Sequence, residues 1–317
     1  MKPLHHLQQE SEDAVESPPT GVLVALDAAA PLGAAPQFVD VDCDGRAVRI
    51  EHQWLNGERA DAALLVFLHE GLGSLSMWRD FPQQLCDAAG CRGLVYSRPG
   101  YGRSTPRARG EDWGADYMHR QACALLPALL SALKVDQVAP PPWLFGHSDG
   151  GSIALLYAAR HPDRVAGCIV VAPHIMVEAL SIEGVSDARA AYLHSGLRAR
   201  LAKYHEDPDS AFWGWNGAWL DPRFLAWSIE AELAAIRCPL LAVQGLDDAY
   251  GSVAQIRGIA RRAPQSVLLE LAGCGHSPHR DQPAQLIAAC TAFLQRHGRA
   301  GKMPHGRSRS NPTDRSA

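Results

Sequence analysis

Long apolar runs are absent from this 317-residue sequence, since no stretch is long enough to cross a bilayer as a helix. The N-terminus is polar and acidic, and it lacks the apolar core of a secretory signal peptide. We therefore expect a cytoplasmic protein with no membrane partner.

Cysteines spaced as Cys-x-x-Cys are also absent, although the chain contains eight cysteines. Several lie in apolar runs, as Cys168 does, where a reduced thiol packs like a small hydrophobic group. The formal net charge of −4 provides no basic field for nucleic acid, so no nucleic-acid partner is expected. The chain has no repeat of fixed period, and no pattern in it indicates an oligomeric state.

The composition is that of a globular protein, with 47% hydrophobic and 20% charged residues. The two ends differ from this average. Residues 1–35 are rich in Ala, Pro, Glu and Ser without a clear period, which predicts a flexible N-terminal segment. Residues 298–317 are basic and serine-rich and have no large apolar side chains, which predicts a disordered tail.

Short apolar runs alternate with helical patterns between these ends. Residues 37–43 and 47–55 alternate apolar and polar around Asp44-Gly45, a hairpin signal. Further strands are predicted at residues 63–68, 93–96, 143–145, 165–171, 240–243 and 267–271, and helices at residues 116–134, 152–160, 252–262 and 282–296. This order predicts an α/β fold with a mostly parallel central sheet flanked by helices.

Residues 175–237 break this rhythm, because they contain no clear buried strand. Helical stretches at residues 187–204 and 224–236 accompany a cluster of aromatic residues. We expect a small helical cap over the strand ends where ligands usually bind, inserted into a core of residues 36–174 and 238–297. The aromatic residues of the cluster are Phe212, Trp213, Trp215, Trp219, Phe224 and Trp227.

Residues 143–152 carry the strongest chemical signal, a Gly-x-Ser-x-Gly motif at Gly146, Ser148 and Gly150 between a short apolar run and a helical pattern. A nucleophile on a tight strand-to-helix turn needs small neighbours two positions away on either side. The N-terminus of the following helix also favours developing negative charge. The motif therefore predicts Ser148 as a nucleophile.

A serine nucleophile needs a base, and the base needs a carboxylate that orients it. His276 lies in a glycine-rich loop between the last predicted strand and the last predicted helix, with His279 as the alternative. Asp247 and Asp248 follow the preceding strand, in the chain order Ser, Asp, His, and either could orient the base. The spacing of His276, His279 and Asp281 suggests a metal site, but no further ligand pattern accompanies it, so neither metal nor cofactor is expected.

Acyl transfer also needs two N–H donors for the oxyanion. One is expected from Asp149, the residue after the nucleophile, and the other from the loop after residues 63–68. Gly71 is the candidate in that loop, because glycine lets the backbone approach closely. Trp213, Trp215 and Tyr250 are candidates for binding a small-molecule substrate.

Five motifs follow one another along the chain: His69-Glu70-Gly71-Leu72-Gly73, Ser97-Arg98-Pro99-Gly100-Tyr101-Gly102-Arg103-Ser104, Gly146-His147-Ser148-Asp149-Gly150-Gly151, Gly245-Leu246-Asp247-Asp248 and Gly273-Cys274-Gly275-His276. In these motifs and in their order, the sequence resembles the α/β-hydrolase superfamily, over about residues 37–296. The family pattern Gly-x-x-Asp favours Asp248 over Asp247, and the cap of the family lies between the sixth and seventh strands, here about residues 175–237.

Glu70 departs from the family pattern, because many relatives carry His-Gly-x-x-Gly in this loop. A buried anion there would oppose the oxyanion unless it is paired or turned away. We expect Glu70 to bond loop N–H groups or to meet Arg98 or His147, with substrate binding as the alternative. Glu70 and Asp149 together would place two acids near the mouth of the active site, and these would disfavour anionic substrates.

The leading hypothesis is a serine hydrolase that cleaves an ester or thioester of a small molecule through an acyl-enzyme. Serine at position 148 argues against the aspartate chemistry of dehalogenases and epoxide hydrolases in this superfamily. One alternative is hydrolysis of a carbon–carbon bond in a product of aromatic-ring cleavage. The other is a non-catalytic homologue that binds ligands.

Overall fold

The computed structural model describes residues 35–137 and 140–298. The predictions for residues 1–34 and 299–317 lie outside this part of the chain. Eight strands form one sheet in the order β1-β2-β4-β3-β5-β6-β7-β8, in which β2 pairs antiparallel with β1 and β4 and all other pairs are parallel. The strands are β1 (Gln37–Cys43), β2 (Arg46–Leu55), β3 (Leu64–Leu68), β4 (Arg92–Tyr96), β5 (Trp143–His147), β6 (Gly167–Val171), β7 (Leu240–Gly245) and β8 (Ser266–Leu271).

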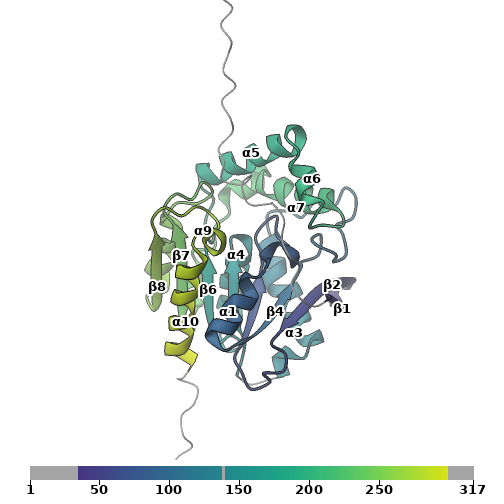
Figure 1. Ribbon diagram of the computed structural model, residues 1–317. Helices are drawn as coiled ribbons and strands as arrows, with labels where there is room; N and C mark the ends of the chain where they lie inside the picture. The colour runs from purple at the N-terminus through teal and green to yellow at the C-terminus, as the bar shows by residue number, and fades with distance from the viewer. Residues whose placement is uncertain (1–34, 138–139, 299–317) are drawn as a thin grey trace, which may run out of the picture.

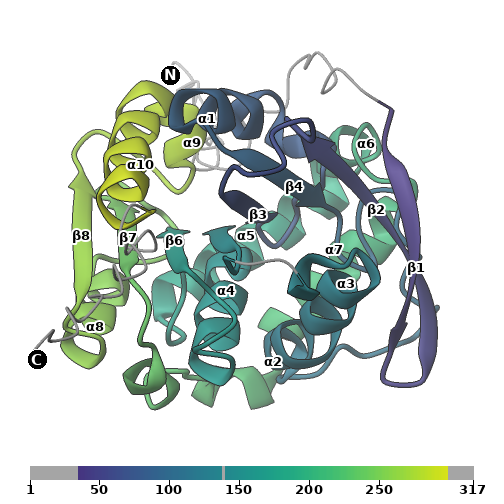
Figure 2. The same cartoon turned by 90° about the horizontal axis from the view of Figure 1, so that it is seen from below.

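The parallel strands at the centre of the sheet are buried on both faces, which explains their continuous apolar sequences. Along β3, Leu65 and Phe67 belong to one hydrophobic cluster, whereas Leu64, Val66 and Leu68 belong to the other. Helices α1 (Phe81–Ala89) and α10 (Pro283–Gly298) cover the first face, and α4 (Asp149–Arg160) lies on the opposite face (Figure 2). The predicted fold class is therefore confirmed.

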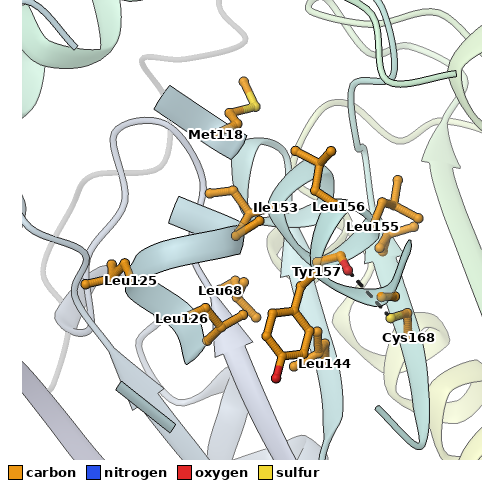
Figure 3. Packing of buried hydrophobic residues seen from close by; sticks show 14 of the residues in the cluster. Leu68, Met118, Leu125, Leu126, Leu144, Ile153, Leu155, Leu156, Tyr157 and Cys168 are labelled. Atoms are coloured by element: carbon orange, nitrogen blue, oxygen red, sulfur yellow. Dashed lines mark hydrogen bonds between the residues drawn. The ribbon is translucent and has the colours of Figure 1, made fainter. Parts of the chain in front are cut away.

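The helix α4 is buried along most of its length. Figure 3 shows Ile153, Leu155 and Leu156 of this helix packed above Leu144 of β5 and Leu68 of β3. Every residue from Asp149 to Ala158 is buried. The element that follows the candidate nucleophile is therefore held on all sides by core packing.

The helix predicted at residues 116–134 is interrupted. The chain forms α2 (Tyr117–Arg120), a π-helical turn at Gln121–Leu125 and α3 (Leu126–Ala132). Pro127 has no N–H to donate, and its ring would clash with the carbonyl four residues earlier in a regular helix. A π-turn just before this proline lets the helix continue.

A helical insertion of residues 172–239 separates β6 from β7 and lies over the carboxyl ends of the strands (Figure 1). It contains α5 (Ala179–His194), α6 (Leu197–Leu201) and α7 (Pro208–Trp219). The helix predicted at residues 224–236 is wrong, since only the 3₁₀ turns Pro222–Ala226 and Glu232–Ala235 form there. Between these turns the backbone is extended and pairs with residues 175–177 instead.

The remaining described α-helices are α8 (Ala254–Arg262), which lies between β7 and β8, and the single turn α9 (Pro278–Asp281), which follows β8. None of the helices in the described ranges combines the length and the apolar character that a membrane crossing requires.

Candidate active site

Ser148 occupies a sharp turn between β5 and α4. Its φ of 52° and ψ of −120° lie in a region that residues with a side chain rarely adopt. A Cβ at Gly146 would collide with the carbonyl of Gly150, and a Cβ at Gly150 would collide with the carbonyl of Leu68. The two glycines of the motif are therefore required by this turn, which raises the hydroxyl of Ser148 above the sheet.

His276 lies in the loop between β8 and α9, and its Nε2 accepts a hydrogen bond from Ser148 Oγ at 3.0 Å. The loop after β7 contacts this loop closely, because the N–H of Asp247 donates to the carbonyl of Cys274 at 2.9 Å. A Cβ at Gly245 would strike the carbonyls of Cys274 and Gly275. Two loops that are distant in the sequence thus place the imidazole beside the serine.

Asp248 completes the constellation, since His276 Nδ1 donates to its two carboxylate oxygens at 2.9 and 2.8 Å. Oδ1 also accepts the backbone N–H groups of Tyr250 at 2.8 Å and Gly251 at 3.2 Å. Asp247 instead is exposed at the cavity and makes no such contact with the imidazole. Of the two aspartates that the sequence left open, the structure brings Asp248 to the base.

The protonation of this pair follows from its surroundings. Burial alone would lower the pKa of His276, but the charge of Asp248 and the hydrogen bond to it raise that pKa above its ordinary value. Burial alone would raise the pKa of Asp248, yet the charge and hydrogen bond of His276 lower it. The arrangement therefore stabilises an imidazolium beside an ionised carboxylate.

The backbone N–H groups of Gly71 and Asp149 are the two expected oxyanion donors. Within the described ranges, no acceptor takes the N–H of Gly71 or that of Asp149. A Cβ at Gly71 would collide with the indole of Trp215, so only glycine fits beneath this tryptophan. Both candidate donors thus come from segments adjoining Ser148, namely the loop after β3 and the first residue of α4.

The carboxylate of Asp149 is fully buried and points away from the cavity, which corrects the expectation that it lies near the mouth. It accepts hydrogen bonds from Tyr117 Oη at 2.7 Å and Trp219 Nε1 at 3.2 Å. Burial raises the pKa of Asp149, and the nearby Arg98 guanidinium opposes that rise. This carboxylate therefore belongs to the support of the site and not to its substrate-facing surface.

Glu70 faces the cavity and meets His147, one of the two partners expected for its side chain. Oε2 lies 3.4 Å from His147 Nδ1, and Oε1 lies 3.7 Å from Arg280 Nη2. Burial would raise the pKa of Glu70, but His147 and Arg280 hold it well below its usual range. His147 Nε2 in turn donates to the carbonyl of His276 at 2.7 Å, so Glu70 is linked to the loop that carries the candidate base.

A cavity of about 310 Å³ lies above Ser148, between the strand ends and the insertion. Of the predicted substrate-binding residues, Glu70, Trp215 and Tyr250 line it. Trp213 does not; it packs against Tyr192 and Phe212 on another side of α7. Further lining side chains are Leu72, Met77, His147, His174, Ser181, Val185, Leu197, Leu201, Trp219, Asp247, His276, Ser277, Arg280 and Asp281.

His174 is a buried lining residue that the sequence reasoning missed. Its ring lies 5.8 Å from that of His276 and edge-on to Trp219 at 4.9 Å. Burial lowers the pKa of His174 to about 3, so the ring is neutral. It follows β6 just as Ser148 follows β5, and the tendency of ligands to bind at the carboxyl ends of parallel strands could have identified it.

His279, the alternative base, is directed into the core. Its ring contacts those of Trp78 at 5.1 Å and His147 at 4.7 Å, and burial holds its pKa well below the usual range. Asp281 Oδ2 accepts the N–H of Gly275 at 2.9 Å. Across residues 35–137 and 140–298, no group of three or more His, Cys, Asp or Glu residues has a geometry that could hold a metal ion.

Similar proteins include enzymes of different chemistry. A 2-succinyl-6-hydroxy-2,4-cyclohexadiene-1-carboxylate synthase from Enterobacter sp. (strain 638) is 28% identical over 257 residues, which cover 73% of this chain and 91% of that protein. A pimeloyl-[acyl-carrier protein] methyl ester esterase from Aromatoleum aromaticum is 28% identical over 262 residues, covering 69% of this chain and 93% of the esterase.

Solved structures share the fold. A thermophilic esterase from Thermogutta terrifontis superposes with a TM-score of 0.64 at 20% identity, covering 83% of this chain and 100% of that one. Esterases and other hydrolases among the relatives support a hydrolase. The model of the alpha/beta hydrolase family matches residues 65–289, more than half of the sequence. The chain therefore belongs to the α/β hydrolase family.

Proposed function

We propose that the protein hydrolyses a carboxylic ester or thioester of a small molecule through an acyl-enzyme on Ser148. The observation that carries the proposal is the continuous hydrogen-bonded series from Ser148 Oγ through His276 to Asp248, at 3.0 and 2.8 Å, at the floor of a cavity. A nucleophile, a base and an orienting acid in contact are the parts that acyl transfer requires.

In the first half of the reaction, Ser148 Oγ attacks the acyl carbon while His276 Nε2 takes the hydroxyl proton. The N–H groups of Gly71 and Asp149 bind the oxyanion of the tetrahedral intermediate. The bond to the leaving group then breaks, and the imidazolium gives its proton to the departing alcohol or thiol. Asp248 stabilises the imidazolium throughout and fixes its orientation.

In the second half, His276 removes a proton from water, and the resulting nucleophile attacks the acyl-enzyme. The second tetrahedral intermediate collapses to release the carboxylic acid, and Ser148 regains its proton. The chain's own residues supply every proton transfer in this sequence.

The substrate that fits best is small and partly apolar. The cavity of about 310 Å³ is at the lower end of the usual range for ligand pockets, and Leu72, Val185, Leu197 and Trp215 give it an apolar wall. Ionised Glu70 faces the same space, which favours neutral acyl groups over anionic ones.

A panel of neutral esters and thioesters of increasing acyl length tests the proposal, with ring-cleavage diketones as a separate arm. Ser148→Ala should remove nearly all turnover and all labelling by a fluorophosphonate while leaving thermal unfolding unchanged. Asp248→Asn should lower kcat by up to about 10⁴-fold, whereas Asp247→Asn, at the neighbouring exposed carboxylate, is the matched control.

Turnover of the diketones alone would contradict ester hydrolysis. Fluorophosphonate labelling of Ser148 without turnover of any substrate would favour the non-catalytic alternative. Undiminished turnover in Ser148→Ala would refute the assignment of the nucleophile.

A further inference from the structure

The carbonyl oxygen of Glu70 accepts two hydrogen bonds from buried side chains behind the site. Arg98 Nη2 donates to it at 2.8 Å, and His69 Nδ1 donates at 2.7 Å. His69 must carry its proton on Nδ1, because its Nε2 accepts the backbone N–H of Arg98 at 3.0 Å. Burial and the charge of Arg98 hold the pKa of His69 well below its ordinary value, as a neutral ring requires.

This carbonyl belongs to the same peptide group as the N–H of Gly71, one of the two candidate oxyanion donors. Resonance joins the C=O and N–H of a peptide group, so donors on the oxygen draw electron density from the nitrogen and strengthen its N–H as a donor. They also fix the plane of the peptide, and with it the direction of that N–H. The two side chains therefore act on the donor without touching the substrate.

The same guanidinium reaches the segment of the second donor. Arg98 Nη2 lies 3.8 Å from Asp149 Oδ2, an oxygen that also accepts from Tyr117. Because the backbone N–H of Asp149 is the other candidate donor, one buried cation adjoins both halves of the anion site.

The charge of Arg98 is only partly compensated. The side chain is fully buried, and within the described ranges its Nε and Nη1 have no hydrogen-bond acceptor. Its contact with the carboxylate of Asp149 is longer than a hydrogen bond, and the face of Tyr101 lies 4.6 Å away. Burying such a cation costs folding free energy, and a transient negative charge nearby offsets part of that cost in the transition state.

We propose that Arg98 is a positioning residue of the oxyanion site, which orients and polarises the Gly71 donor and steadies the Asp149 donor. The inference rests on the proposed acyl transfer at Ser148. It adds that the charge of Arg98 contributes to the stabilisation of the oxyanion in that reaction. The charge is preorganised in the folded protein, so it requires no rearrangement when the oxyanion forms.

Arg98→Met and Arg98→Lys test this role, with Arg257→Met as the control because Arg257 is an exposed arginine paired with Glu270. Measurements are kcat and KM for the best ester, the inhibition constant of a trifluoromethyl ketone that forms a hemiketal oxyanion on serine, and thermal unfolding. In Arg98→Met we expect kcat to fall about 10²-fold, as for loss of one oxyanion donor, with KM changed less than about 3-fold. Ketone affinity should fall by a similar factor, and Arg98→Lys should recover part of both.

A lower kcat with unchanged ketone affinity, or an unchanged kcat, overturns the proposal. If Arg98→Met does not unfold cooperatively, His69→Asn and His69→Leu decide instead, because the Asn amide can replace the Nδ1–H donor and Leu cannot. Equal kcat and equal ketone affinity in this pair also overturn it.

The rate of fluorophosphonate labelling keeps this test separate from the proposed function, because negative charge develops on the phosphoryl oxygen in the same site while Ser148 displaces fluoride, without any turnover. If no acyl substrate is turned over, ester hydrolysis fails, but slower labelling of Arg98→Met still supports the role of Arg98. Equal labelling rates in Arg98→Met and wild type overturn that role.

Discussion

Asp149 and Glu70 are two carboxylates on the two segments that carry the candidate oxyanion donors, and their surroundings accommodate them in different ways. Asp149 is fully buried and satisfied by hydrogen bonds from Tyr117 and Trp219 beside the Arg98 cation. Glu70 keeps 16% of its side chain exposed to the cavity and faces His147 and Arg280. The comparison shows that an acid beside the candidate oxyanion donors is accommodated either by burial among hydrogen-bond donors or by nearby basic side chains on the cavity wall.

The largest effect should come from removing the sequestered carboxylate. Asp149→Ala leaves the Arg98 cation without its carboxylate and two buried donors without acceptors, so we expect a loss of about 3–5 kcal/mol in the free energy of unfolding. Denaturant unfolding measures this loss. Asp149→Asn keeps an acceptor and should lose less. A stability for Asp149→Ala within about 1 kcal/mol of wild type would remove the distinction between the two carboxylates.

The next effect concerns the base that both carboxylates influence. Activity requires neutral His276, whose pKa Asp248 raises above its ordinary value. The value of kcat/KM should therefore rise with pH through a midpoint above about 6.5 and fall about tenfold per pH unit below it. A pH profile measured with a neutral ester checks this. A rate that is flat from pH 5 to 9 would argue against histidine as the base.

The sequence predicted the sheet and the candidate site far better than the insertion, and the reasons are local. Strands buried on both faces must be continuously apolar, and the elbow around Ser148 leaves no room for a Cβ at Gly146 or Gly150. Both requirements can be read from residue types alone. The choice between Arg98 and His147 as the partner of the Glu70 carboxylate could not be read in this way, because it depends on how two loops approach each other in space.

The sequence prediction placed Trp213 at the cavity, because the start of α7 was not recognised. Asp207 caps α7 by accepting the N–H of Ser210, and a proline occupies the first helical position. Had this start been recognised, the spacing of four residues would have placed Trp215 and Trp219 on one face of the helix and Trp213 on another. The packing of residues 224–236 against residues 175–177 is a tertiary contact that local propensity does not encode.

Removing the charge of Glu70 should have a smaller effect than the previous two changes. The Glu70 anion contributes to raising the pKa of His276, so Glu70→Gln should move the acid limb of the kcat/KM profile to lower pH. Asp247→Asn, which neutralises another acid on the same cavity, is the control. A limb that stays in place in Glu70→Gln, or that moves equally in both variants, would show that Glu70 has no specific influence on the base.

The smallest effect concerns substrate charge. Because Glu70 is an ionised carboxylate on the cavity wall whereas Asp149 is sequestered, a neutral ester should be preferred over an isosteric ester with a free carboxylate by a few-fold in kcat/KM. Glu70→Gln should narrow this ratio and Asp149→Asn should not. Raising the salt concentration should narrow it in the wild type as well, because the cavity is open to solvent and its charges are screened. An equal change of the ratio in the two variants would mean that burial does not separate these carboxylates in function.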